Sequence, residues 1–140
     1  MKLLGCGICH TDGALVGDPN YSLNLAGSSV GIAYTNPMVD KYPGVIYPSN
    51  ITPDVETGIG SWSESEIIRL LCSGEASHDS QLLAVMPWPT YAWLTDSDAL
   101  AIATYLRSLP PVKHRVPENV PAGRVATSPY VHFGVYQSRK

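Results

Sequence analysis

The chain has little charge, few cysteines and no long apolar run. Only 15% of its 140 residues are charged, and no basic stripe accompanies an aromatic platform, which argues against a nucleic-acid partner. No run of about 18 apolar residues occurs, so no transmembrane helix is predicted. No secretory leader is visible either, because Met1 and Lys2 leave no room for an apolar stretch before the first cysteine. These absences favour a single globular domain whose partner is another protein.

The charge that is present is spread unevenly along the chain. Residues 1–109 carry four basic and eleven acidic side chains, a formal charge of −7. Residues 110–140 carry five basic side chains and one acidic side chain, a formal charge of +4. Because opposite charges steer proteins toward one another, we expect the acidic part to dock on a protein with a complementary patch.

The three cysteines are too few for a paired zinc site. Cys6 and Cys9 form a C-x-x-C pair, but zinc would need two further ligands at paired spacing, and Cys72 stands alone. A thioredoxin-like pair would follow a strand in a βαβ context, and residues 1–5 do not predict one. Both of these functions of the cysteine pair are therefore disfavoured.

With His10, the pair has the C-x-x-C-H form of covalent c-type haem attachment. Two thiols separated by two residues can each form a thioether to one porphyrin, and the next residue then presents an imidazole to the iron. We therefore expect one covalent haem c, attached through Cys6 and Cys9, with His10 as an iron ligand. A cysteine-based redox module without haem stays open as an alternative, because attachment of this kind takes place outside the cytoplasm and no export signal is visible.

Residues 11–61 form a long irregular stretch in which proline and glycine turns recur every few residues. A loop of this length normally counts against one compact domain. A large apolar cofactor beneath it removes the objection, because the loop then has a surface on which to pack. Two short apolar segments, residues 30–34 and 45–47, can pair briefly as strands.

Two helices are predicted from their capping residues. Ser63 and Glu66 form a capping box, followed by an apolar face that includes Cys72 as a packed thiol, with a stop at Gly74. A second helix begins after Thr95 and ends near residue 109, with its acidic side chains in the first turn as the helix dipole favours.

Met86 is the predicted second iron ligand. A thioether on a rigid loop is the ligand that favours reduced haem iron, and Pro87 and Pro89 restrict this loop. Most methionines only pack in the core, but of the three in this chain Met86 has the most suitable position for an iron ligand. The competing candidates are the remaining histidines, His78, His114 and His132. They lie in a polar loop or in the proline-rich tail, where histidines are more often solvated surface residues.

Six motifs run in order along most of the chain. They are Cys6-x-x-Cys9-His10, the 44–54 segment GVIYPSNITPD, Thr57-Gly58-Ile59-Gly60-x-Trp62-Ser63, Met86-Pro87-x-x-x-Tyr91, Leu94-Thr95-Asp96-x-Asp98 and the 105–110 segment YLRSLP. Over roughly residues 5–112 the chain resembles the cytochrome c subunits and domains of bacterial membrane-bound alcohol and sugar dehydrogenases and related periplasmic oxidoreductases.

This resemblance implies a small all-α cytochrome c-like domain over residues 1–111, with long irregular loops around one haem. It implies His10 and Met86 as axial ligands. The further haem contacts that it implies are Asn50, Ile51, Trp62 and Pro87. The chain departs from the family in having one C-x-x-C-H and only five residues ahead of it, so we expect an N-terminal helix and a leader to lie upstream. Residues 112–140 are expected to form an extended tail that packs on this domain or on a partner.

The function that follows is electron transfer rather than catalysis. The predicted haem would pass electrons between a periplasmic or membrane-bound dehydrogenase or respiratory complex and an acceptor, on the extracytoplasmic side of the membrane. The predicted partner is therefore a redox protein or a larger electron-transfer complex. The alternative is a haem enzyme or a gas-binding haem sensor with an open distal site, and ligation by Met86 distinguishes the two.

Overall fold

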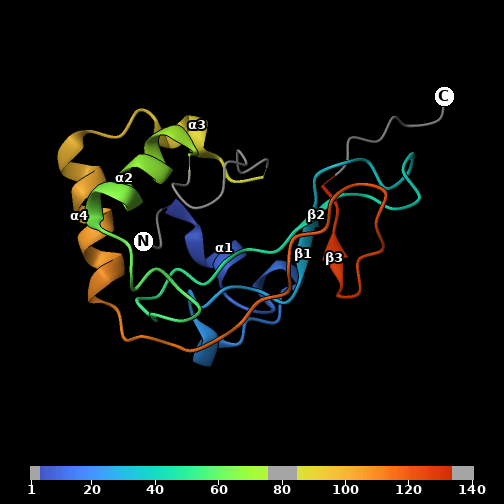
Figure 1. The fold of residues 1–140 in the computed structure, drawn as a ribbon, viewed down its shortest axis with the longest axis horizontal. Coiled ribbons are helices and arrows are strands. Elements are labelled where there is room, and N and C mark those ends of the chain that lie inside the picture. Colours follow the sequence, from blue (N-terminus) through green and yellow to red (C-terminus); the bar gives the residue numbers. More distant parts are fainter. Residues whose placement is uncertain (1–3, 76–84, 134–140) are drawn as a thin grey trace.

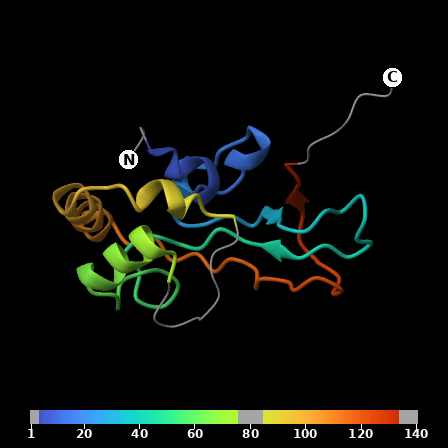
Figure 2. The same cartoon turned by 90° about the horizontal axis from the view of Figure 1, so that it is seen from above.

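The computed structural model describes residues 4–75 and 85–133 of the chain (Figure 1). In chain order, its elements are α1 (Cys6–His10), η2 (Ala14–Val16), η3 (Tyr21–Leu23), β1 (Gly31–Ala33), β2 (Val45–Ile46), α2 (Glu64–Ser73), α3 (Trp88–Tyr91), α4 (Asp96–Ser108) and β3 (Tyr130–Val131). Helices α2, α3 and α4 lie at one end of the molecule and the strands at the other, with α1 between them (Figure 1). Seen from above, α1 and α2 lie on opposite faces (Figure 2).

Both helices predicted from capping residues are confirmed. The Ser63 hydroxyl accepts a hydrogen bond from the Glu66 backbone N–H, and the Glu66 carboxylate accepts one from the Ser63 N–H, which completes the capping box of α2. At the start of α4, the Thr95 hydroxyl accepts a hydrogen bond from the Asp98 N–H. Gly74 ends α2 in the left-handed conformation, with φ of 72°.

The two helices pack on one apolar core. Its buried members come from the loop before α2 and from helices α2, α3 and α4: Ile59, Ile67, Leu71, Tyr91, Ala103 and Leu106. Cys72 is partly buried against this core, as its position on the apolar face of α2 predicted, and Trp62 packs there as well. This helical end supplies one side of the functional site.

The expected all-α fold is wrong, because the chain also forms a mixed three-stranded sheet with the strand order β2-β1-β3. Strands β1 and β2 pair antiparallel, with Ile32 opposite Ile46, so the pairing of the two short apolar segments is confirmed. Strand β3 from the tail pairs in parallel with β1. Strands of two or three residues are too short to show an alternating pattern, so the sequence contained no periodic signal for the sheet.

The tail from residue 112 to residue 133 runs back along the rest of the chain. The Val112 N–H donates to the Thr52 hydroxyl at 3.1 Å, and the His114 N–H donates to the Thr57 hydroxyl at 3.1 Å. Farther on, Val120 and Val45 exchange two backbone hydrogen bonds of 2.8 Å. The tail therefore reaches the segment after β2, which forms a wall of the site described next. Within residues 4–75 and 85–133, no helix has both the length and the apolar character needed to cross a membrane.

Candidate functional site

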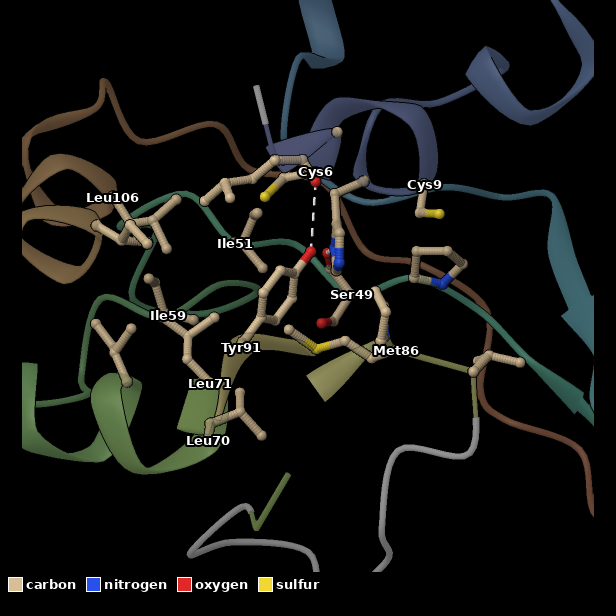
Figure 3. Close-up of a pocket in the computed structure, with 18 of the residues that line it drawn as sticks. Cys6, Cys9, Ser49, Ile51, Ile59, Leu70, Leu71, Met86, Tyr91 and Leu106 are labelled. Carbon is tan, nitrogen blue, oxygen red and sulfur yellow. Dashed lines mark hydrogen bonds between the residues drawn. The ribbon is translucent and has the colours of Figure 1, made fainter. Parts of the chain in front are cut away.

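A cavity of about 230 Å³ lies between α1, the segment after β2 and the helical core. Cys6, Cys9 and His10 line it from α1, and Met86 lines it from the segment that precedes α3, across the cavity from α1 (Figure 3). The rest of the wall is mainly apolar. Ile51 comes from the segment after β2, and the helical core contributes Ile59, Leu71, Tyr91 and Leu106 (Figure 3). Four residues whose predicted roles are attachment and ligation therefore face one apolar space.

No disulfide joins Cys6 and Cys9. Burial raises the pKa of both thiols, and for Cys6 a backbone hydrogen bond opposes the shift in part. Reactive cysteine pairs instead have a lowered thiol pKa, because the thiolate is the nucleophile. The shift for this pair is in the opposite direction.

His10 is held in one tautomer. Its Nδ1 lies 2.7 Å from the Ser49 carbonyl oxygen, and because a carbonyl can only accept, Nδ1 must carry the proton. The Nε2 lone pair of the neutral ring is then available as a metal ligand. Burial lowers the pKa of His10, and the hydrogen bond to Ser49 opposes this only in part, so the neutral ring is favoured. In metal sites, the ring nitrogen of a ligating histidine that does not bind the metal usually donates to a carbonyl or carboxylate, which orients the imidazole.

The backbone around Gly27 connects α1 to this carbonyl. The Gly27 N–H donates to the His10 carbonyl oxygen at 2.9 Å, and the Ser28 N–H donates to the Pro48 carbonyl oxygen at 3.0 Å. The segment on either side of Gly27 thus holds both the end of α1 and the chain that presents Ser49.

Most of the further haem contacts expected from the sequence lie on the cavity. Ile51, Trp62 and Pro87 line it, but Asn50 does not. Asn50 is 2% exposed, and its amide donates to the Val112 carbonyl oxygen at 2.7 Å and to the Thr57 hydroxyl at 3.0 Å. These bonds fasten the tail to the wall behind the cavity, and direct contact between Asn50 and a haem stays a prediction.

The competing histidines are placed away from the cavity where the structure describes them. His114 Nδ1 donates to the Ala26 carbonyl oxygen at 2.9 Å, and neither His114 nor His132 is among the lining residues. His78 lies outside the described residues.

Four polar lining residues were not assigned a role from the sequence: Tyr47, Ser49, Tyr91 and Asn119. The first three of these residues stand inside two of the six sequence motifs, so their place in the pattern was the available signal. The Tyr91 hydroxyl donates to the Leu4 carbonyl oxygen at 3.3 Å, as the dashed line in Figure 3 shows. Asn119 reaches the cavity only because the tail folds back, which no local pattern could indicate.

The residues present fit a covalently bound haem. Two thiols, one imidazole nitrogen with a free lone pair and one thioether are the attachment groups and ligands of haem iron in c-type sites, and the apolar wall suits a porphyrin. Over the described part of the chain, no cluster of three or more His, Cys, Asp or Glu side chains could hold a metal ion by itself.

No family model matches the chain. A nicotinate dehydrogenase subunit from Pseudomonas putida is 34% identical over 114 residues, which are 81% of this chain and 8% of that protein. The fructose dehydrogenase cytochrome subunit from Gluconobacter japonicus is 34% identical over 111 residues, 78% of this chain and 20% of that protein. The cytochrome c subunit of the quinone alcohol dehydrogenase from Gluconobacter oxydans is 34% identical over 112 residues, 79% of this chain and 20% of that protein.

The chain thus spans a fifth or less of the length of these relatives. The matched part nevertheless covers about four fifths of the chain, and the names of the matched proteins agree with the resemblance seen in the motifs. The chain is a homologue of the cytochrome c subunits of bacterial dehydrogenases.

Proposed function

We propose that this chain transfers electrons through a single haem c, bound covalently by Cys6 and Cys9 and ligated by His10 and Met86. The observation that supports the proposal best is that these four side chains, from two distant parts of the sequence, line the same apolar cavity. When bound, the haem supplies a one-electron redox couple.

The chain's own residues hold and shield the cofactor. Cys6 and Cys9 would fix it to α1, and the hydrogen bond from Nδ1 to the Ser49 carbonyl leaves the His10 Nε2 lone pair available as the iron ligand. Met86 offers its sulfur on a segment stiffened by Pro87. Ile51 and Trp62 exclude water from the porphyrin face. His10 and Met86 would hold the iron in both oxidation states, so little of the structure would have to move.

The proposed partner is a dehydrogenase or respiratory complex on the extracytoplasmic side of the membrane. Three relatives are named as dehydrogenase subunits, and the formal charge of −7 on residues 1–109 suits docking on a basic patch. In this proposal the chain transforms no substrate itself. Residues 1–111 form the haem-binding unit and residues 112–140 the tail that packs on it or on the partner.

Haem staining after denaturing electrophoresis tests the attachment. We expect the full chain, produced with a haem-attachment system, to keep its haem under denaturing conditions and the double variant C6A/C9A to lose it. C72A is the matched control and should keep the stain, because Cys72 packs against the helical core and does not line the cavity. Haem that acid-acetone extracts from the unaltered chain would contradict the proposal.

A further inference from the structure

The opening of the cavity is marked by the lining residues that are themselves exposed. Only three of the described lining residues are largely exposed to solvent, namely Ser49, Pro87 and Asn119. Two of these three are polar, whereas the deeper wall is mainly apolar. No lysine or arginine is among the described residues that line the cavity. A negatively charged group therefore finds its most favourable place at this opening, where water and polar side chains meet it.

The side chain of Asn119 has a fixed orientation there. Its Oδ1 accepts a hydrogen bond of 2.8 Å from the Tyr47 backbone N–H, and Val120 beside it is tied to Val45 by two backbone hydrogen bonds. Because an N–H can only donate, the oxygen of the amide must face Tyr47 and the NH₂ group must face away from it. Within the described residues, Asn119 Nδ2 has no acceptor, so it is a donor held ready at the opening.

The tyrosine hydroxyls on the same wall are already used. The Tyr47 hydroxyl donates to the Ser128 carbonyl oxygen at 3.0 Å, and the Tyr91 hydroxyl donates to the Leu4 carbonyl oxygen at 3.3 Å. Each hydroxyl has only one proton to donate, so neither can serve a second acceptor as a donor.

We propose that Asn119 donates a hydrogen bond from Nδ2 to a propionate carboxylate of the bound haem, so that the tail is part of the haem site. This inference rests on the proposed function. Haem carries two propionates, and burying an unpaired carboxylate is costly. Because no lysine or arginine is among the lining residues that the structure describes, a propionate is best placed at the opening. There the carboxylate meets an amide whose oxygen is occupied and whose NH₂ group is free.

Asn119→Asp separates this donor role from the structural role of the side chain. An aspartate can still accept the Tyr47 N–H, but it replaces the NH₂ group with a charged oxygen. Asn36→Asp is the matched control, because Asn36 is exposed, its Oδ1 also accepts a backbone N–H, that of Met38 at 2.9 Å, and it does not line the cavity. The measurements are the midpoint potential of the haem-loaded full chain as a function of pH and the propionate bending band in its resonance Raman spectrum.

We expect N119D to lower the midpoint potential at neutral pH, because a second negative charge beside the propionate stabilises ferric iron. The pH-dependent step that reports the propionate should move to higher pH, and the propionate band should shift. N36D should leave all three unchanged. Equal effects of N119D and N36D, or no effect of either, would overturn the role of Asn119 while leaving the haem site intact. A full chain that binds no covalent haem would overturn the proposed function and this inference together.

Discussion

Replacing Gly27 with alanine tests how the backbone supports the imidazole site. Gly27 has φ of 89°, in the left-handed region, and an added Cβ would lie 2.8 Å from both the Pro48 carbonyl oxygen and the Asn50 nitrogen. These are backbone atoms on either side of Ser49, so they cannot turn aside as a side chain would. The variant should therefore push the 48–50 segment away and lengthen the hydrogen bond between His10 Nδ1 and the Ser49 carbonyl.

The size of the effect follows from two separate costs. A side chain in the left-handed region costs about 1–2 kcal/mol, and forcing an extra carbon into a packed site costs about 1–3 kcal/mol more. The free energy of unfolding should thus fall by about 2–5 kcal/mol, a large part of the roughly 5–15 kcal/mol of an ordinary domain.

Gly17→Ala is the matched control, because Gly17 has φ of 80° and nothing lies within 4 Å of its added Cβ. Its free energy of unfolding should fall only by the cost of a side chain in the left-handed region, about 1–2 kcal/mol. Urea unfolding followed by far-ultraviolet circular dichroism measures both variants. Equal destabilisation by G27A and G17A would refute the close approach of Gly27 to the segment that carries Ser49.

Two further substitutions test the surrounding fold. Ser63→Ala removes the acceptor of the Glu66 N–H and should lower the free energy of unfolding by about 1 kcal/mol, whereas Ser61→Ala, outside the capping box, should change it by less than about 0.5 kcal/mol in the same urea titration. Hydrogen bonds from the Thr57 hydroxyl and then the Thr57 N–H lower the pKa of Asp54 in the folded chain. A carboxyl with a lowered folded-state pKa stabilises the fold above its ordinary value of 3.8, and this contribution disappears as the pH falls through the folded-state pKa. Asp54→Asn should therefore lose less stability than the unaltered chain on acidification below that value, and equal losses in urea titrations at several pH values would contradict the assignment.

The parts of the fold that were predictable are those written in local sequence. A capping box places the start of α2 within four residues, Ser63 to Glu66, and the left-handed Gly74 places its end. Capping and first-turn residues predicted the position of α4 in the same way. Of the sheet, only the pairing of β1 with β2 was predicted; the pairing of β3 with β1 was not, because these strands are about a hundred residues apart and only two or three residues long.

The site was also predictable only in part. The spacing of Cys6, Cys9 and His10 indicates haem attachment, and the fold brings these residues to one cavity with Met86. The part played by Asn50 could not be read from its motif, because its hydrogen-bond partner Val112 belongs to the tail. Asn119 was missed for the same reason, since the backbone pairing of Val120 with Val45 brings it to the cavity. Tertiary contacts of this kind leave no trace in local sequence.

The ferric absorption spectrum of the haem-loaded chain, compared between the unaltered protein and Met86→Ala, tests the central claim most directly. The account predicts a weak band at the red edge of the visible spectrum from iron–thioether ligation, its loss in M86A, and carbon monoxide binding to the ferrous form of M86A alone. His114→Ala and His132→Ala should keep the band, because neither side chain lines the cavity. A spectrum without this band in the unaltered protein, together with carbon monoxide binding to its ferrous form, would contradict ligation by Met86 and would favour a haem enzyme or sensor with an open distal site.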